Sequence, residues 1–180
     1  MNKLSYKIAL GGVMASICLM FMFLTSVFPL LAMAIPIYTG ALLIIVAVEI
    51  SSSWAFLTYA AVSVLSLFVT PDKEAAVLFI MFFGYYPILR RILEDKLKFK
   101  PLKWLCKLAV FNTAIIAAYY IIISIFGVYS LTDEFGFLGE HMILILLCFA
   151  NGVFLLYDIT LAMLESAYVK WFRKVYLRKK

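Results

Sequence analysis

The order of apolar and charged residues along the chain is typical of a protein that crosses a membrane several times. From Ile8 to Val48, 41 consecutive residues include no Asp, Glu, Lys, Arg or His. Further uncharged segments follow, and short polar stretches separate them. A helix rises about 1.5 Å per residue and the hydrocarbon core is about 30 Å thick, so about 20 residues make one span. The first uncharged segment is therefore long enough for two helices.

Proline positions and polar breaks divide the chain into six predicted helices. Pro29 and Pro36 lie near the middle of the first uncharged segment, where the chain must reverse, because proline ends helices and favours turns. Residues 70–74, Thr-Pro-Asp-Lys-Glu, predict a tight turn and a helix start, since Thr or Asp caps a helix and Glu favours its first turn. We expect spans at about 8–28, 36–50, 54–69, 75–92, 105–125 and 142–164.

Composition supports a membrane solvent for much of this chain. It is 66% hydrophobic and 14% charged, whereas a soluble domain is nearer 45–50% apolar and about 25% charged. The first apolar run reaches Val27 and is longer than the usual 7–15-residue core of a signal peptide, so we interpret it as a retained span. The predicted fold class is all-α, an integral membrane bundle of six transmembrane helices forming a single domain over residues 1–180.

The distribution of basic residues predicts the orientation. Six spans place both termini, the break at 49–53 and a basic connector at 90–107 on one side of the membrane. Fifteen of the 16 Lys and Arg residues then lie on that side, and only Lys73 lies on the other. Because basic loops stay in the cytoplasm, we expect a multi-pass protein with both termini cytoplasmic and a basic tail over 165–180. The net charge of +6 is thus explained without a nucleic-acid partner.

The sequence offers little support for catalysis or for a cofactor. Cys18, Cys106 and Cys148 each stand alone, and the chain has one histidine, which favours neither a metal cluster nor a redox pair. The Walker, HExxH and Gly-x-Ser-x-Gly motifs do not occur in the sequence, and these are the motifs of nucleotide, zinc-protease and serine-hydrolase chemistry. We expect no cofactor and no enzymatic activity from this chain by itself.

Span 1 carries small residues at helical spacing in its predicted cytoplasmic half. Gly11 and Ala15 form one small-xxx-small pair, and Gly12 and Ser16 form another, one turn after Ala9. Small side chains let two helix backbones approach closely, which strengthens contacts that lipid cannot replace. Packing inside the chain and contact with a partner helix are both compatible with this pattern.

Three polar residues of span 6 share one helix face. Asn151, Asp158 and Glu165 are separated by seven residues each, which brings them to the same side of a helix. Charged groups at membrane depth are costly and usually face the protein interior or a water-filled cavity. A ligand site or a proton relay is one interpretation, and an ion pair of Asp158 with Arg90 or Arg91 is the interpretation we favour.

Asn112 places a second amide at mid-membrane depth in span 5. It is able to bond Asn151 across the two helices, an interaction worth about 0.6–2 kcal/mol. The alternative is that both amides bind polar atoms of a ligand.

Residues 83–87, Phe-Gly-Tyr-Tyr-Pro, interrupt span 4. Proline leaves the carbonyl of Phe83 without its helical donor, and Gly84 permits close approach, so a kink is predicted. Broken helices often frame transporter sites, and a kink made for packing alone is equally compatible.

Several aromatic and polar residues fall near the outer ends of the predicted spans. Together they would line an outward-facing pocket with aromatic walls and a few polar anchors. For each tyrosine alone, the alternative is the aromatic belt at the membrane surface. The candidate substrate-binding residues are Tyr38, Tyr119, Tyr120, His141 and Asn151.

The whole chain resembles the substrate-binding S components of energy-coupling factor transporters, in its size, its six predicted spans and its cytoplasmic termini. Ala9, Gly12 and Ala15 resemble the small-residue motif by which the first helix of that family docks on a transmembrane coupling subunit. The resemblance implies capture of a vitamin-like micronutrient from outside a bacterial cell membrane. It also implies partnership with the coupling subunit and two ATPase subunits, which drive uptake by toppling the capture subunit in the membrane.

Two other functions compete with substrate capture. One is a membrane scaffold or assembly protein that binds protein partners and no solute, through the basic connector and tail. The other is a small intramembrane enzyme that uses Asp158 and Glu49.

Overall fold

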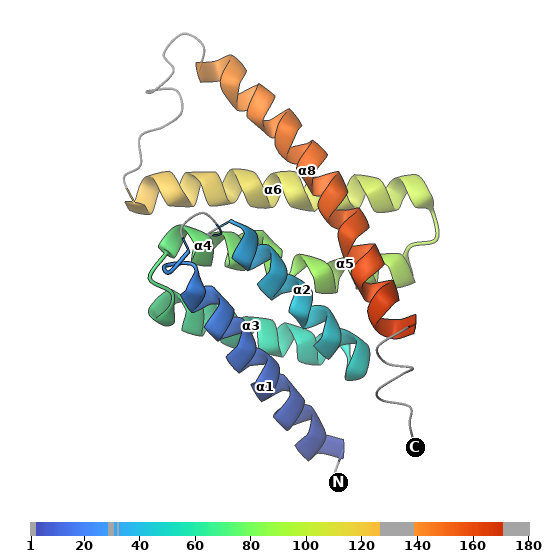
Figure 1. Ribbon diagram of the computed structural model, residues 1–180. Helices are drawn as coiled ribbons and strands as arrows, with labels where there is room; N and C mark the ends of the chain where they lie inside the picture. The colour runs from blue at the N-terminus through green and yellow to red at the C-terminus, as the bar shows by residue number, and fades with distance from the viewer. Residues whose placement is uncertain (1–2, 29–30, 32, 127–138, 171–180) are drawn as a thin grey trace.

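The computed structural model describes residues 3–28, 31, 33–126 and 139–170, with the backbone alone for 3, 125, 126 and 139–143. The regular elements over these ranges are all helices (Figure 1). Each of the six predicted spans coincides with helical structure. Five stretches are long and apolar enough to cross a membrane, and they are Leu4–Leu24, Ser52–Val69, Lys73–Lys96, Lys100–Ser124 and Leu144–Lys170. The sixth, Ala34–Glu49, is apolar but shorter.

The helices form two groups around a central pair (Figure 1). The centre consists of α2 (Ala34–Glu49) and an interrupted helix made of α4 (Lys73–Leu78), the π-helix η2 (Phe79–Phe83) and α5 (Tyr86–Lys96). On one side of this pair lie α1 (Lys3–Leu24) and α3 (Ser52–Val69). On the other side lie α6 (Lys100–Phe126) and α8 (Gly139–Ala167), and α8 crosses α6 obliquely.

Two clusters of buried side chains hold these groups together, and the central helices contribute to both. The first cluster joins α1, α2, α3 and the interrupted helix, and the second joins α2, η2, α5, α6 and α8. Leu43 lies in the first cluster and its neighbour Ile44 in the second. On η2, Phe79 likewise lies in the first cluster and Phe82 in the second. The central helices are therefore buried on two faces, whereas α1 and α8 each keep an exposed apolar face.

Aromatic rings make up most of the second cluster. Phe111 of α6 stacks on Phe154 of α8 with ring centres 4.5 Å apart, and Phe82 stacks on Tyr86 at 4.7 Å. Phe82 also meets Phe111 and Phe154 edge to face. Lipid tails are as apolar as these rings, so the helices associate through close packing and ring geometry more than through exclusion of water.

The predicted kink in the fourth span is confirmed, and its geometry explains two glycines. The Gly84 amide donates to Phe79 O over 2.7 Å, a bond to the residue five positions back, and Pro87 has no amide to offer Phe83 O. The backbone of α2 approaches this carbonyl, because a Cβ added to Gly40 would lie 1.9 Å from Phe83 O. Gly40 therefore directs a Cα hydrogen toward Phe83 O, an acceptor that lacks its usual helical donor because of Pro87.

The turn at 70–74 also forms as predicted. Asp72 Oδ1 accepts a hydrogen bond from the Ala75 amide at 3.1 Å and so caps α4. Lys73 Nζ donates to the carbonyls of Leu67 and Thr70, 2.8 Å each, and so satisfies the last turn of α3. These contacts fix the reversal between α3 and α4.

The prediction of a basic connector over 90–107 is wrong for most of its length. Helix α5 continues to Lys96 and α6 begins at Lys100, so only residues 97–99 link them. Arg and Lys are good helix formers, and several of them bond across this hairpin, which lets both helices extend past their apolar segments. The basic tail expected over 165–180 is described as far as Lys170, and the remaining tail residues lie outside the described ranges.

We expect Gly40→Ala to destabilise the protein, because the new methyl group would overlap Phe83 O. Overpacking of this kind costs about 1–3 kcal/mol. Gly152→Ala is the matched control, since a Cβ at Gly152 meets no atom within 4 Å and alanine favours a helix by about 0.5–1 kcal/mol. Thermal unfolding of both variants in detergent tests the difference, and equal midpoints would contradict the close approach of α2 to η2.

Candidate functional site

A cluster of seven charged side chains joins α5, α6 and α8 at one end of the bundle. Four are cations and three are carboxylates, and each takes part in at least one ion pair. We call this set the charge cluster, and its members are Arg90, Arg91, Glu94, Lys103, Lys107, Asp158 and Glu165. The three helices are thus tied together by charge as well as by the aromatic cluster beside them.

Asp158 is the centre of the charge cluster. Its Oδ1 accepts hydrogen bonds from the Tyr86 hydroxyl at 2.5 Å and from Arg90 Nε at 3.0 Å, and its Oδ2 accepts from Lys107 Nζ at 2.9 Å. Asp158, Arg90 and Lys107 are all buried. The prediction left Arg90 and Arg91 open as partners of Asp158; the partner is Arg90, and Arg91 pairs with Glu165. Both carboxylate oxygens of Asp158 are occupied by donors, which offsets the cost of removing this charge from water.

Two glutamates complete the cluster at its more exposed edge. Glu165 accepts from Arg90 Nη1 at 3.1 Å and from Arg91 Nη1 at 3.2 Å. Glu94 bonds the two lysines of α6, each over 2.7 Å. The sequence analysis missed Lys107 as a partner of Asp158, although Lys107 is a charged residue inside the apolar run from Leu105 onward, where a charge needs a partner.

The predicted bond between Asn112 and Asn151 is also confirmed. Each amide nitrogen donates to the other residue's side-chain oxygen at 3.0 Å. Each also donates to a carbonyl of its own helix, that of Leu108 or Leu147, at 2.8 Å. All four amide hydrogens are therefore used within the chain, and the pair holds α6 to α8 at the depth where the helices cross.

A groove lies beside the interruption in the fourth span, between that helix, α3 and α6, with a volume of about 620 Å³. We call it the helix-break groove, and it is lined by Tyr59, Ile80, Met81, Tyr85, Leu89, Ala109, Val110, Thr113, Ala114 and Ala117. A Cβ added to Gly84 would lie only 2.6 Å from the Tyr59 ring. The Tyr59 hydroxyl donates to Ile80 O at 2.7 Å. A side chain thus supports the backbone where the regular helix bonds are broken.

The helix-break groove has the chemistry of a binding site for an uncharged molecule. Of the described residues that line it, none is charged, and the hydroxyls of Tyr85 and Thr113 donate to no other described residue. Its volume falls within the range of small-molecule sites, about 300–1,000 Å³. Gly84 is 11 residues from the start of α4, or about 17 Å along the helix axis, so the groove lies near the middle of this span.

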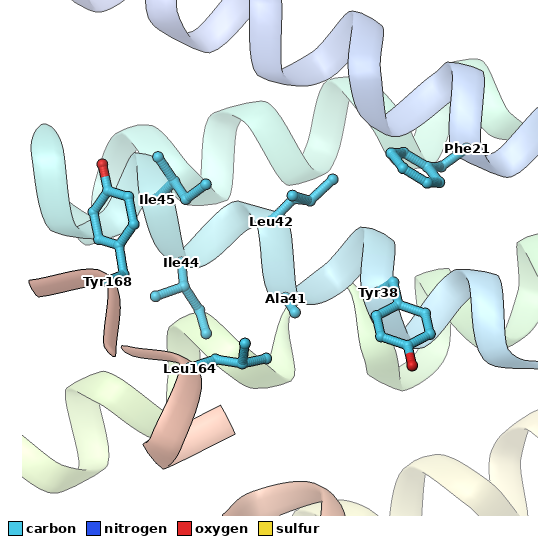
Figure 2. A pocket seen from close by; sticks show the side chains of 8 residues that line it. All are labelled: Phe21, Tyr38, Ala41, Leu42, Ile44, Ile45, Leu164 and Tyr168. Carbon is cyan, nitrogen blue, oxygen red and sulfur yellow. The ribbon is translucent and has the colours of Figure 1, made fainter. Parts of the chain in front are cut away.

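A second groove, of about 310 Å³, is apolar throughout (Figure 2). It follows α2 and is closed by Phe21 of α1 and Leu164 of α8, with Tyr38 at one end and Tyr168 at the other. The Tyr168 hydroxyl donates to Glu49 Oε1 at 3.3 Å. These surroundings suit an acyl chain or an apolar side chain better than a polar solute.

The structure distributes the predicted outer-pocket residues over different surfaces. Tyr38 is 65% exposed on α2, and Tyr120 is 64% exposed on α6, where its ring centre lies 5.9 Å from that of Tyr119. Asn151 is engaged in the amide pair. His141 lies in the first turn of α8, and its side chain is outside the described part.

The small residues of α1 face in two directions. Gly11 turns inward, where a Cβ would meet a side chain of α3 at 3.4 Å. Gly12 turns outward, and a Cβ there would meet no atom within 4 Å. Ala9 and Ser16 are exposed on the same side, whereas Ala15 packs against the first cluster. The exposed small-residue face therefore consists of Ala9, Gly12 and Ser16. The third predicted contact residue, Ala15, is not part of this face.

Comparison with protein-family models, curated proteins and solved structures gives no match to this chain.

Replacing Asp158 by asparagine is expected to destabilise the protein strongly. Arg90 and Lys107 would lose the buried carboxylate that they share and keep only the more exposed Glu165 and Glu94. Removing one partner of a buried ion pair costs about 3–5 kcal/mol. Glu165→Gln is the control, because Glu165 is 23% exposed and a partly solvated pair contributes about 1 kcal/mol or less. Thermal unfolding in detergent measures both, and similar losses would show that Asp158 is not the centre of the cluster.

Proposed function

We propose that this chain is a membrane-embedded capture subunit of a multicomponent uptake transporter, and that its solute binds in the helix-break groove. The observation that carries the proposal is an uncharged groove with open hydroxyls beside a π-helix. Single π-turns inside helices are frequent at functional sites. Interrupted helices near the middle of a span are the usual frame of transporter sites.

The lining indicates the chemical class of the solute. Tyr59 and Tyr85 present aromatic walls, and Thr113 of α6 presents a hydroxyl. Aliphatic side chains and alanines fill the rest of the surface. A small, uncharged molecule with an apolar body and a few hydrogen-bonding groups fits these features, as a vitamin-like micronutrient does.

The exposed face of α1 supports assembly with a partner. Ala9, Gly12 and Ser16 offer a shallow surface on a helix that packs mainly on α2 and α3 among the described elements. A transmembrane coupling subunit with two ATPase subunits is the partner set that fits uptake. In this arrangement the protein lies in a bacterial cell membrane with both termini and the charge cluster toward the cytoplasm, in keeping with the positions of its basic residues.

A membrane scaffold that binds protein partners and no solute is the second candidate. The packing of the second cluster favours it, because Phe82, Phe111 and Phe154 fill the space between the central helices and α6–α8. A scaffold would use the α1 face in the same way. The two candidates differ in whether a small molecule accompanies the protein.

The solute is tested by native mass spectrometry of protein purified gently from its own membranes, followed by analysis of the extracted small molecules. We expect one small molecule bound per chain, and we expect Tyr85→Phe to weaken it about fivefold, the value of one hydrogen bond of about 1 kcal/mol. Tyr120→Phe is the matched control, because Tyr120 lies on the exposed side of α6.

Two outcomes would contradict the proposal. Protein partners without a small molecule would favour the scaffold. Loss of the molecule in Tyr120→Phe but not in Tyr85→Phe would move the solute site to the outer ends of the spans.

Gly12→Leu is expected to weaken partner binding while leaving the chain folded. The new side chain points away from the bundle, so it would keep a partner helix at a distance. Overpacking a helix contact by about 1–3 kcal/mol lowers affinity about fivefold or more. Gly152→Leu is the control, since it makes the same change at another open position. Co-purification of membrane partners measures the effect, and equal recovery with both variants would exclude the α1 face.

A further inference from the structure

A third groove, of about 510 Å³, opens between α8 and the hairpin of α5 and α6. Its lining is basic on one side and apolar on the other. We call it the basic groove, and it is lined by Glu94, Lys100, Lys103, Trp104, Lys107, Asp158, Ile159, Ala162, Met163 and Ser166. A hollow with these two kinds of wall suits an amphiphile.

The polar wall has more positive than negative charge. Lys103 and Lys107 are bonded to Glu94, and Lys107 also reaches Asp158. Lys100 is exposed and forms no ion pair with any described residue. The three lysines therefore exceed the two carboxylates of the lining by one charge. Arg90 and Arg91 outnumber Glu165 in the adjoining part of the cluster, so the local excess is larger still.

The start of α6 adds to this field. The helix begins at Lys100, and the first amides of a helix carry a partial positive charge of about half an elementary charge. The buried ammonium of Lys107 also lies 5.1 Å from the centre of the Trp104 ring. The Lys107 ammonium and the Trp104 ring form a cation–π contact. This contact lies where the polar wall of the groove meets its apolar wall.

The apolar wall continues along α8. Ile159 is 46% exposed and Met163 is 64% exposed, and both lie beside the groove on a helix apolar enough to span a membrane. Ser166 lies one turn further, toward the charged end. An acyl chain lying along Ile159 and Met163 would bring an attached headgroup to the lysines.

We propose that the basic groove binds the headgroup of an anionic phospholipid, with its phosphate at Lys100 and Lys103 and its acyl chains along Ile159 and Met163. Basic pockets between membrane helices recognise anionic headgroups through this combination of charge and apolar surface. A free phosphate would use the polar wall alone, so the apolar wall favours the lipid. The bound lipid connects α6 to α8 at the end where the charge cluster already joins them.

The test is native mass spectrometry of the full chain in neutral detergent with equal amounts of phosphatidylglycerol and phosphatidylcholine of the same acyl length. We expect one phosphatidylglycerol retained in preference to phosphatidylcholine. Lys100→Gln should lower its retention about fivefold, the factor that one lysine near an anionic lipid contributes. Lys96→Gln is the matched control, because Lys96 is exposed on the last turn of α5 and does not line the groove.

A parallel measurement distinguishes the lipid from a free anion. The unfolding midpoint of the wild type is recorded with phosphatidylglycerol, phosphatidylcholine and inorganic phosphate in turn. The proposal is supported if only phosphatidylglycerol raises the midpoint, and if this rise is smaller in Lys100→Gln and unchanged in Lys96→Gln. An equal rise with inorganic phosphate, equal retention of the two lipids, or the same loss in both variants overturns it.

Discussion

One carboxylate organises the charged end of this bundle. Asp158 receives three donors, Tyr86 and Arg90 from α5 and Lys107 from α6, and is itself carried by α8. An unpaired charge at this depth would cost several kcal/mol, so these three helices must meet here in register. The stacked rings of Phe111 and Phe154 lie one helical turn away from Lys107 and Asp158, toward the middle of α6 and α8, and share that register.

The interrupted helix imposes the second constraint. Its π-turn lets Phe79 and Phe82 point to different clusters, and Pro87 leaves Phe83 O available to the backbone of α2. The glycine at position 40 is required because no side chain fits between these two backbones. The same break creates the groove at Tyr85, so the packing of the central helices and the candidate solute site have a common origin.

The sequence was sufficient to predict the contacts that depend on a single scarce residue. Asp158 is a rare charge in an apolar helix, and Arg90 was one of few partners, so their pairing was predictable, as was that of the two asparagines. The basic connector was predicted to be too long because charge was taken as a sign of a loop, whereas Lys96 and Lys103, outside the predicted spans, belong to helices. Gly40 and the helix-break groove were not predictable, because spacing gives the face of a helix but not which neighbour it meets. The outer pocket stays a prediction.

The attachment of α8 has a mechanical consequence. Asn151 and Asp158 lie seven residues apart on α8, about 10 Å along the helix, and each is held by a different partner. A helix held at two such points can neither rotate about its axis nor change its tilt between them. A force applied to the turns of α8 before Asn151 therefore acts on the Asn112–Asn151 pair before it acts on Asp158 and its donors.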